Sequence, residues 1–115
     1  MTFEAFDVVV VPFPFTDRST TKRRPALVLS DGGGFNAQVG QAAMAMITSA
    51  KNSEWPLDVE IADLDSAGLP SASLVRMKLF TLDERLVIRK AGKLAPHDRD
   101  RVVESLRRLL PQTAK

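Results

Sequence analysis

The chain has 115 residues, 44% of them hydrophobic, which suits a single compact domain over residues 1–115. It has no cysteine and one histidine, which excludes disulfides and thiolate chemistry and argues against a histidine-cluster metal site; we expect no cofactor. No stretch is long and apolar enough to span a membrane and no signal peptide is evident, so we expect a cytoplasmic protein.

The net charge of +2 is small, but the charges are unevenly distributed. Residues 25–75 contain one basic and six acidic side chains, whereas residues 76–115 contain eleven basic and five acidic ones. This asymmetry allows a basic face that binds phosphates. It equally allows basic side chains spread around a solvated surface.

In chain order, the first half is typical of strands. Residues 6–13 contain four consecutive valines and predict a buried strand that ends or bends at the following prolines. A polar loop is expected over 16–23, a second strand over 25–30, and a turn or loop at the glycines 32–34. Residues 38–48 are ambiguous, because their Ala and Met residues favour a helix while a glycine and the flanking strands oppose it.

The second half begins with residues 57–62, whose alternating pattern predicts a half-exposed strand. A loop with one helical turn is expected over 63–70, and a strand over 72–80. Residues 82–85 predict a short helical turn and residues 87–94 a short strand or extended segment.

The clearest helix is expected over residues 97–110. Its apolar residues form one stripe, which predicts a core or dimer contact: Val102, Val103, Leu106, Leu109 and Leu110. Acidic residues in the first turn and basic residues in the last match the helix dipole. Five or six short strands closed by one helix indicate a mainly β fold, a small and strongly bent antiparallel barrel.

The dipeptide Arg23-Arg24, followed by Pro25, is the first candidate for chemistry. Proline restricts the preceding residue to an extended backbone, so Arg24 is expected at the mouth of a strand and not on a loop tip. A fixed guanidinium can bond two oxygens of a phosphate or carboxylate at once. The alternative is that Arg24 only braces the loop or pairs with Asp17.

Four blocks in order along the chain resemble the PemK/MazF family of bacterial toxins: D-V-V-V-V-P-F-P-F-T (residues 7–16), R-R-P-A-L-V-L-S (residues 23–30), I-T-S (residues 47–49) and K-L-F-T-L-D with R-L (residues 78–86). The resemblance implies small dimeric endoribonucleases encoded with an antitoxin. It also implies an SH3-like antiparallel β-barrel, shared with the CcdB-type toxins, and it makes residues 38–48 a strand.

The resemblance also assigns residues. The family's catalytic arginine and hydroxyl match Arg24 and Thr48, and further substrate contacts are expected from Arg23, Arg76, Thr16, Asp17 and Ser49. In some members an acidic residue closely follows the arginine that matches Arg76. Here no acid follows it, which puts carboxylate-assisted catalysis in doubt. Thr48 could instead be an ordinary β-branched strand residue, and Arg76 an ordinary surface arginine.

We therefore expect a metal-independent RNA-cleaving toxin, in which the 2′-hydroxyl of single-stranded RNA attacks the neighbouring phosphorus. Its expected partners are single-stranded RNA, an acidic antitoxin and a second copy of the chain, with no membrane. Two alternatives remain: a non-catalytic module that binds RNA or an acidic peptide, and a CcdB-like topoisomerase poison. Trp55 could stack on a base or simply pack against the protein.

Overall fold

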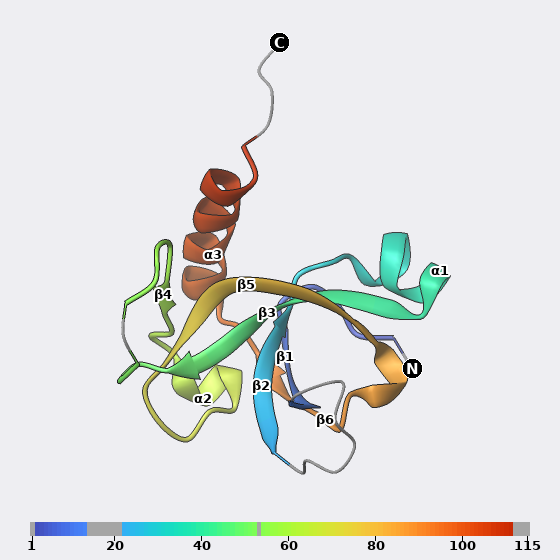
Figure 1. Ribbon diagram of the computed structural model, residues 1–115, viewed down its shortest axis with the longest axis horizontal. Coiled ribbons are helices and arrows are strands. Elements are labelled where there is room, and N and C mark those ends of the chain that lie inside the picture. Colours follow the sequence, from blue (N-terminus) through green and yellow to red (C-terminus); the bar gives the residue numbers. More distant parts are fainter. Residues whose placement is uncertain (1, 14–21, 53, 112–115) are drawn as a thin grey trace.

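The computed structural model describes residues 2–13, 22–52 and 54–111. In these residues the strands form one antiparallel sheet, in the spatial order β4-β5-β3-β2-β1-β6 (Figure 1). The strands are β1 (Asp7–Pro12), β2 (Arg23–Val28), β3 (Gln41–Ser49), β4 (Val59–Glu60), β5 (Ser73–Asp83) and β6 (Arg89–Lys93). The helical segments are η1 (Gly32–Asn36), α1 (Ala37–Val39), α2 (Leu64–Ala67), η2 (Glu84–Leu86) and α3 (Pro96–Leu109).

Strand β1 is buried on both faces of the sheet, as its four consecutive valines predict. Val8 belongs to the core cluster that contains Val102 of α3, whereas Val9 and Val11 belong to a second cluster on the other face with Met44. The sheet curls around this second cluster as a half-barrel, with α3 standing outside the curl (Figure 1). The expected mainly β fold with a C-terminal helix is confirmed.

The two outer strands of the curled sheet are linked through α2, which follows β4 and packs against β6. The Ser66 hydroxyl donates a 2.7 Å hydrogen bond to the Lys93 carbonyl. Gly68 caps α2 with φ +71°, and a Cβ at this position would lie 2.0 Å from the Ala91 carbonyl oxygen. Only glycine tolerates both conditions, so Gly68 allows α2 to approach β6 closely.

The helix α3 is fixed at its first turn by Asp98, which is 1% exposed. Its carboxylate accepts hydrogen bonds from the backbone amides of Ala62 and Asp63, at 2.9–3.1 Å, and forms a 2.7 Å ion pair with Arg101. Burial alone would raise the pKa of Asp98, but the two amides and Arg101 outweigh it and lower this pKa. Asp98 therefore does more than match the helix dipole, the role that the sequence predicts. It also links the first turn of α3 directly to the loop after β4.

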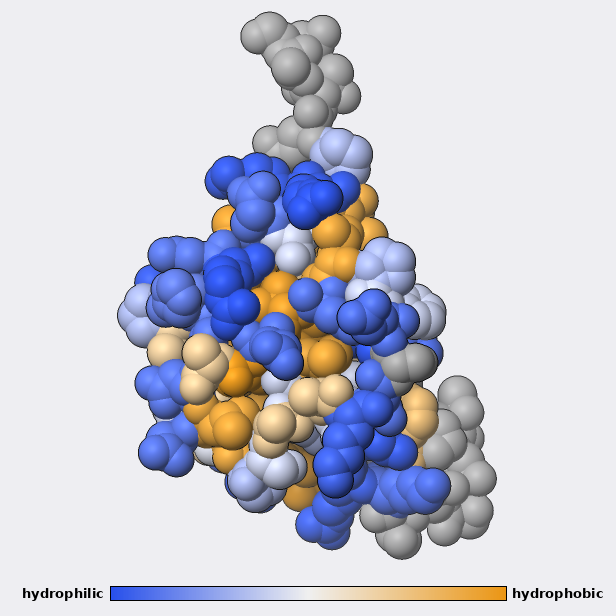
Figure 2. All heavy atoms as spheres, turned by 90° about the vertical axis from the view of Figure 1, so that its left-hand side faces the viewer, coloured by the Kyte–Doolittle hydropathy of each residue, from blue (hydrophilic) through white to orange (hydrophobic). Residues whose placement is uncertain are grey.

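The apolar stripe of α3 is only partly covered. Val102 is fully buried and Leu106 and Leu109 pack against the core, but Leu110 is 59% exposed and lies beyond the end of the helix. Figure 2, seen from the side of α3 and β4, shows apolar atoms below the helix between hydrophilic margins. No helix in the described part of the chain is long and apolar enough to cross a membrane.

A second buried carboxylate, Asp7, joins β1 to β6 at the opposite end of the sheet order from β4. It accepts the Glu4 amide at 2.9 Å and pairs with Lys90 and Lys93 at 3.2 and 3.0 Å. Burial opposes ionisation, but the Glu4 amide and the two lysines outweigh it and lower the pKa of Asp7. These contacts hold the outer strand β6 in place.

Two expectations are wrong. The glycines 32–34 begin helical turns and not an irregular loop, because the Asp31 side chain accepts the Gly34 amide and the buried Asn36 amide donates to the Phe3 and Ser30 carbonyls. The expected strand over 57–62 shrinks to the two residues of β4. The chain before it turns, with Leu57 at φ +68°.

Candidate active site

An open cleft of about 340 Å³ crosses the three neighbouring strands β2, β3 and β5. Its walls combine basic, hydroxyl and apolar side chains: Phe13, Arg24, Met46, Thr48, Arg76, Lys78, Leu79 and Phe80. Three predicted site residues, Arg24, Thr48 and Arg76, therefore meet in one cleft although they are far apart in sequence. None of the described side chains lining it is acidic, so this part of the cleft suits a phosphate.

Arg24 is the second residue of β2 and pairs with Val11 of β1, so its backbone is held in the sheet as the following proline predicted. Its side chain is half-buried, and its guanidinium carbon lies 5.7 Å from the centre of the Phe13 ring. A cation over an aromatic face is attracted by the ring's quadrupole, which orients the guanidinium without neutralising its charge. Among the described residues, Arg24 has no carboxylate within ion-pair distance.

Thr48 lies near the end of β3, the strand between β2 and β5. Its hydroxyl oxygen accepts a hydrogen bond from the Asn52 side-chain amide. A hydroxyl that accepts one hydrogen bond still has its own proton to donate. Thr48 can therefore donate to an anion in the cleft while Asn52 fixes its oxygen.

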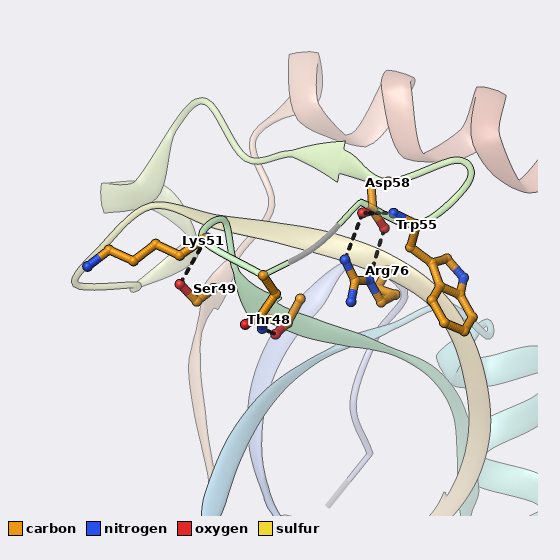
Figure 3. A network of polar contacts seen from close by, with 7 residues as sticks. Thr48, Ser49, Lys51, Trp55, Asp58 and Arg76 are labelled. Atoms are coloured by element: carbon orange, nitrogen blue, oxygen red, sulfur yellow. Dashed lines mark hydrogen bonds and ion pairs between the residues drawn. The ribbon is translucent and has the colours of Figure 1, made fainter.

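Arg76 of β5 is held by a carboxylate that the sequence analysis did not assign to the site. Its Nε and NH2 groups donate to the two oxygens of Asp58 at 3.2 and 2.9 Å (Figure 3). These hydrogen bonds to Asp58 raise the pKa of the Arg76 guanidinium, which stays a cation. No acid follows Arg76 in sequence, but Asp58, from the loop before β4, pairs with it in space.

An irregularity in β5 brings a third cation into the cleft, beside Arg24 and Arg76. The register with β3 jumps from Leu79, opposite Ala45, to Arg76, opposite Met46, so two residues bulge from the ladder. Of these two, Met77 is buried in the core while Lys78 is exposed and lines the cleft. Bulges of this kind re-aim side chains next to functional sites.

The other predicted site residues lie elsewhere. Arg23 is exposed and lines a neighbouring hollow of about 280 Å³ together with Arg89, and Arg24 borders both spaces. Ser49 is exposed and accepts the Lys51 amide at 3.2 Å, on the side of β3 away from Arg76 (Figure 3). Two further predicted residues, Thr16 and Asp17, lie outside the described residues.

A larger hollow, of about 780 Å³, borders the loop before β4. Among the described residues, its lining includes three carboxylates, Glu54, Asp58 and Glu60, and no basic side chain. This hollow repels phosphates, so size does not identify the candidate site. Among the described residues, no three acidic or histidine side chains are grouped so that they could hold a metal ion.

The described residues thus form a small curled β-sheet with a basic, hydroxyl-containing cleft, and comparisons with known proteins identify the family. The family model for the PemK-like, MazF-like toxins of type II toxin–antitoxin systems matches residues 4–110. The chain belongs to this family, whose members are endoribonucleases. No curated protein matches the chain.

Solved structures show the same fold. A MazE–MazF complex from Deinococcus radiodurans is similar with a TM-score of 0.73 and 24% identity, over 98% of this chain and 99% of that one. An endoribonuclease bound to its cognate antitoxin, from a mycobacterial species, has a TM-score of 0.76 and 13% identity, over 98% and 99%. The Mycobacterium tuberculosis toxin MazF-mt6 has a TM-score of 0.73 and 16% identity, over 94% and 99%.

Proposed function

We propose that this toxin cleaves single-stranded RNA without a metal ion, by attack of the 2′-oxygen on the adjacent phosphorus. The observation that carries the proposal is the meeting of Arg24, Thr48 and Arg76 in one cleft whose described lining contains no acidic side chain. Single strands fit this role because their bases are unstacked and can be splayed over a surface.

The reaction places extra negative charge on the non-bridging oxygens of the phosphate. The Arg24 fork can bond two of these oxygens, and the Thr48 hydroxyl can donate to one. Arg76 adds a fixed positive charge to the same cleft. The products are a 2′,3′-cyclic phosphate on the upstream fragment and a 5′-hydroxyl on the downstream fragment.

Asp58 acts through Arg76 in this proposal. Both of its oxygens are engaged by the Arg76 guanidinium, and one also accepts the Trp55 amide at 3.1 Å. A carboxylate whose two oxygens both bond one guanidinium holds that guanidinium in a fixed orientation. Asp58 is therefore a positioning residue that holds Arg76 toward the substrate.

We place the protein in the cytoplasm as a homodimer with an acidic antitoxin. The cleft is short and open, so a strand of several nucleotides is better held across two subunits whose Arg23, Arg24 and Arg76 side chains converge. A disordered acidic segment could fold over the same cations and exclude RNA. Sedimentation should give twice the chain mass, and a monomer that retains full activity would contradict the dimer.

The experiment for the reaction is incubation of a mixed-sequence RNA with the protein in excess EDTA, followed by mass spectrometry of the fragment ends. We expect cleavage to persist and upstream fragments to carry a cyclic phosphate. A substrate with a single 2′-deoxy sugar at the cut position should resist. Cleavage of that substrate, or strict Mg²⁺ dependence, would refute the mechanism.

Thr48 is tested by a pair of substitutions. Thr48→Ser keeps the hydroxyl and should retain most activity, whereas Thr48→Val keeps the shape and removes the donor. We expect the valine variant to lose about 10- to 100-fold in kcat, somewhat less than the loss of a full oxyanion-hole donor. Equal activity of the two variants would show that Thr48 is only a strand residue.

A further inference from the structure

The only tryptophan of the chain, Trp55, is 42% exposed and lies between the cations of the cleft and the neighbouring acidic hollow. The Arg76 guanidinium carbon lies 5.5 Å from the centre of its ring, and the Lys78 ammonium lies 5.3 Å from it. Both cations also line the cleft with Arg24 and Thr48. The indole thus lies beside Arg76 (Figure 3) and Lys78, and 42% of the residue is exposed to solvent.

The backbone of Trp55 is held in place by the same carboxylate that orients Arg76. The Trp55 amide donates to Asp58 at 3.1 Å, and the Asp58 amide donates to the Trp55 carbonyl at 3.2 Å. Leu57, inside this turn, has φ +68°, a conformation that costs free energy in a residue with a side chain. A tied turn with a strained residue indicates that the position of the ring is specified and not incidental.

We propose that Trp55 is a stacking platform for the base of a nucleotide next to the phosphate held in the cleft. The inference rests on the proposed RNA substrate. Any base has a π face that can stack on the exposed indole, and Arg76 and Lys78 attract the phosphate of the same nucleotide. The acidic hollow on whose border Trp55 lies repels the backbone, so the strand follows the cations and only a base meets the ring.

Intrinsic fluorescence reports on this site alone, since the chain has one tryptophan and no tyrosine. The probe is a randomised 12-nucleotide 2′-O-methyl RNA, which binds but cannot supply a 2′-hydroxyl for cleavage. A 12-unit abasic strand with the same phosphates is its control. We expect the base-bearing strand to quench the fluorescence at saturation and the abasic strand to leave it nearly unchanged.

Variants provide a second readout, the dissociation constant of the same probe carrying a terminal dye. Trp55→Leu should weaken binding about 5- to 150-fold, the range observed for one base–aromatic stack, and Trp55→Phe should weaken it less. With cleavable RNA, Trp55→Leu should raise KM and leave kcat nearly unchanged. The matched control is Phe35→Leu, an aromatic side chain with the same 42% exposure on η1, which should bind like the original protein.

Thermal unfolding of each variant shows whether it is folded under the assay conditions. Equal quenching by the abasic strand, or a Trp55→Leu protein that binds the probe as tightly as the Phe35→Leu control, would overturn the platform. If the original protein cleaves RNA in that case, the proposed function survives. If the original protein neither binds nor cleaves any strand, both proposals fall.

Discussion

Two ion pairs in this molecule each join an aspartate to an arginine, but they differ in which side chain is buried and in what surrounds the pair. In the pair Asp98–Arg101 the carboxylate is the buried member, at 1% exposed, and it also accepts two backbone amides. In the pair Asp58–Arg76 the side chains are 15% and 11% exposed, and the arginine lines the cleft. The first pair joins α3 to the loop after β4, whereas we propose that the second directs a cation toward the substrate.

The surroundings of the two pairs support this division. Close to the cleft pair, Arg24 keeps its charge over an aromatic ring and Lys78 is exposed, so positive charge remains available. Close to the helix pair, the charge of Asp98 is compensated by Arg101 and by backbone amides. Of these two pairs, the one in the cleft is therefore the candidate for function.

The largest expected effect is on the cleft side. Arg24→Ala should lower kcat about 10²- to 10³-fold, as for the loss of one oxyanion donor, with no loss of folded protein. Arg24→Lys should also be poor, because an ammonium cannot bond two phosphate oxygens in a planar fork. Single-turnover cleavage measures both, with Arg108→Ala, an exposed arginine of α3, as the control. Full activity of Arg24→Ala would remove Arg24 from the site.

On the helix side, Asp98→Ala should lower the free energy of unfolding by about 2–3 kcal/mol, because it leaves the Ala62 and Asp63 amides without their acceptor. Urea denaturation measures this loss. The control Asp100→Ala removes an exposed carboxylate from the same helix and should change stability little. The specific activity of folded Asp98→Ala protein should be unchanged; a large loss of activity would break the division between the two pairs.

A smaller effect is expected when the cleft pair loses its negative charge. Asp58→Asn keeps the shape of the side chain but weakens its hold on Arg76, and should lower kcat/KM about tenfold, with partial recovery in Asp58→Glu. Glu60→Gln, an exposed carboxylate of β4, is the control. An unchanged kcat/KM for Asp58→Asn would show that Arg76 needs no positioning.

The smallest effect is a gradual loss of stability in acid. The pKa values of Asp7 and Asp98 are lowered in the folded protein, so their stabilisation is complete above the unfolded value of about 4. It is lost as the pH falls from there through the folded values. Urea denaturation from pH 6 to pH 3 should show this decline, and Asp98→Asn should flatten it. If the free energy of unfolding fell equally steeply with pH in the original protein and in Asp98→Asn, the role of Asp98 would be contradicted.

The sequence predicts those parts of the fold that local pattern controls. The valine run of β1, the proline-flanked β2 and the apolar stripe of α3 each carry a periodicity or a backbone restriction that survives in the structure. The helical turns at 32–39 were missed because their stability depends on Asn36 bonding to Phe3, a contact between distant residues. The three glycines themselves do not indicate the contact between Asn36 and Phe3.

The site was likewise predictable only in part. The R-P dipeptide and the I-T-S triplet lead to Arg24 and Thr48, which the structure places in one cleft. Asp58 was missed because its contact with Arg76 depends on the pairing of β4 with β5 and on the turn at Leu57. The only sequence signal was an acid within the alternating segment before β4, which is equally typical of a solvent-facing strand residue.

The division between the two pairs is tested most directly by the salt dependence of RNA affinity for Arg76→Ala and Arg101→Ala, which each remove one arginine from an Asp–Arg pair. For single strands, each phosphate contact contributes about 0.7 to the slope of log affinity against log salt. We expect Arg76→Ala to reduce the slope by about that amount for each copy that meets the strand, and Arg101→Ala to leave it unchanged. Equal reductions, or a reduction in Arg101→Ala alone, would contradict the account.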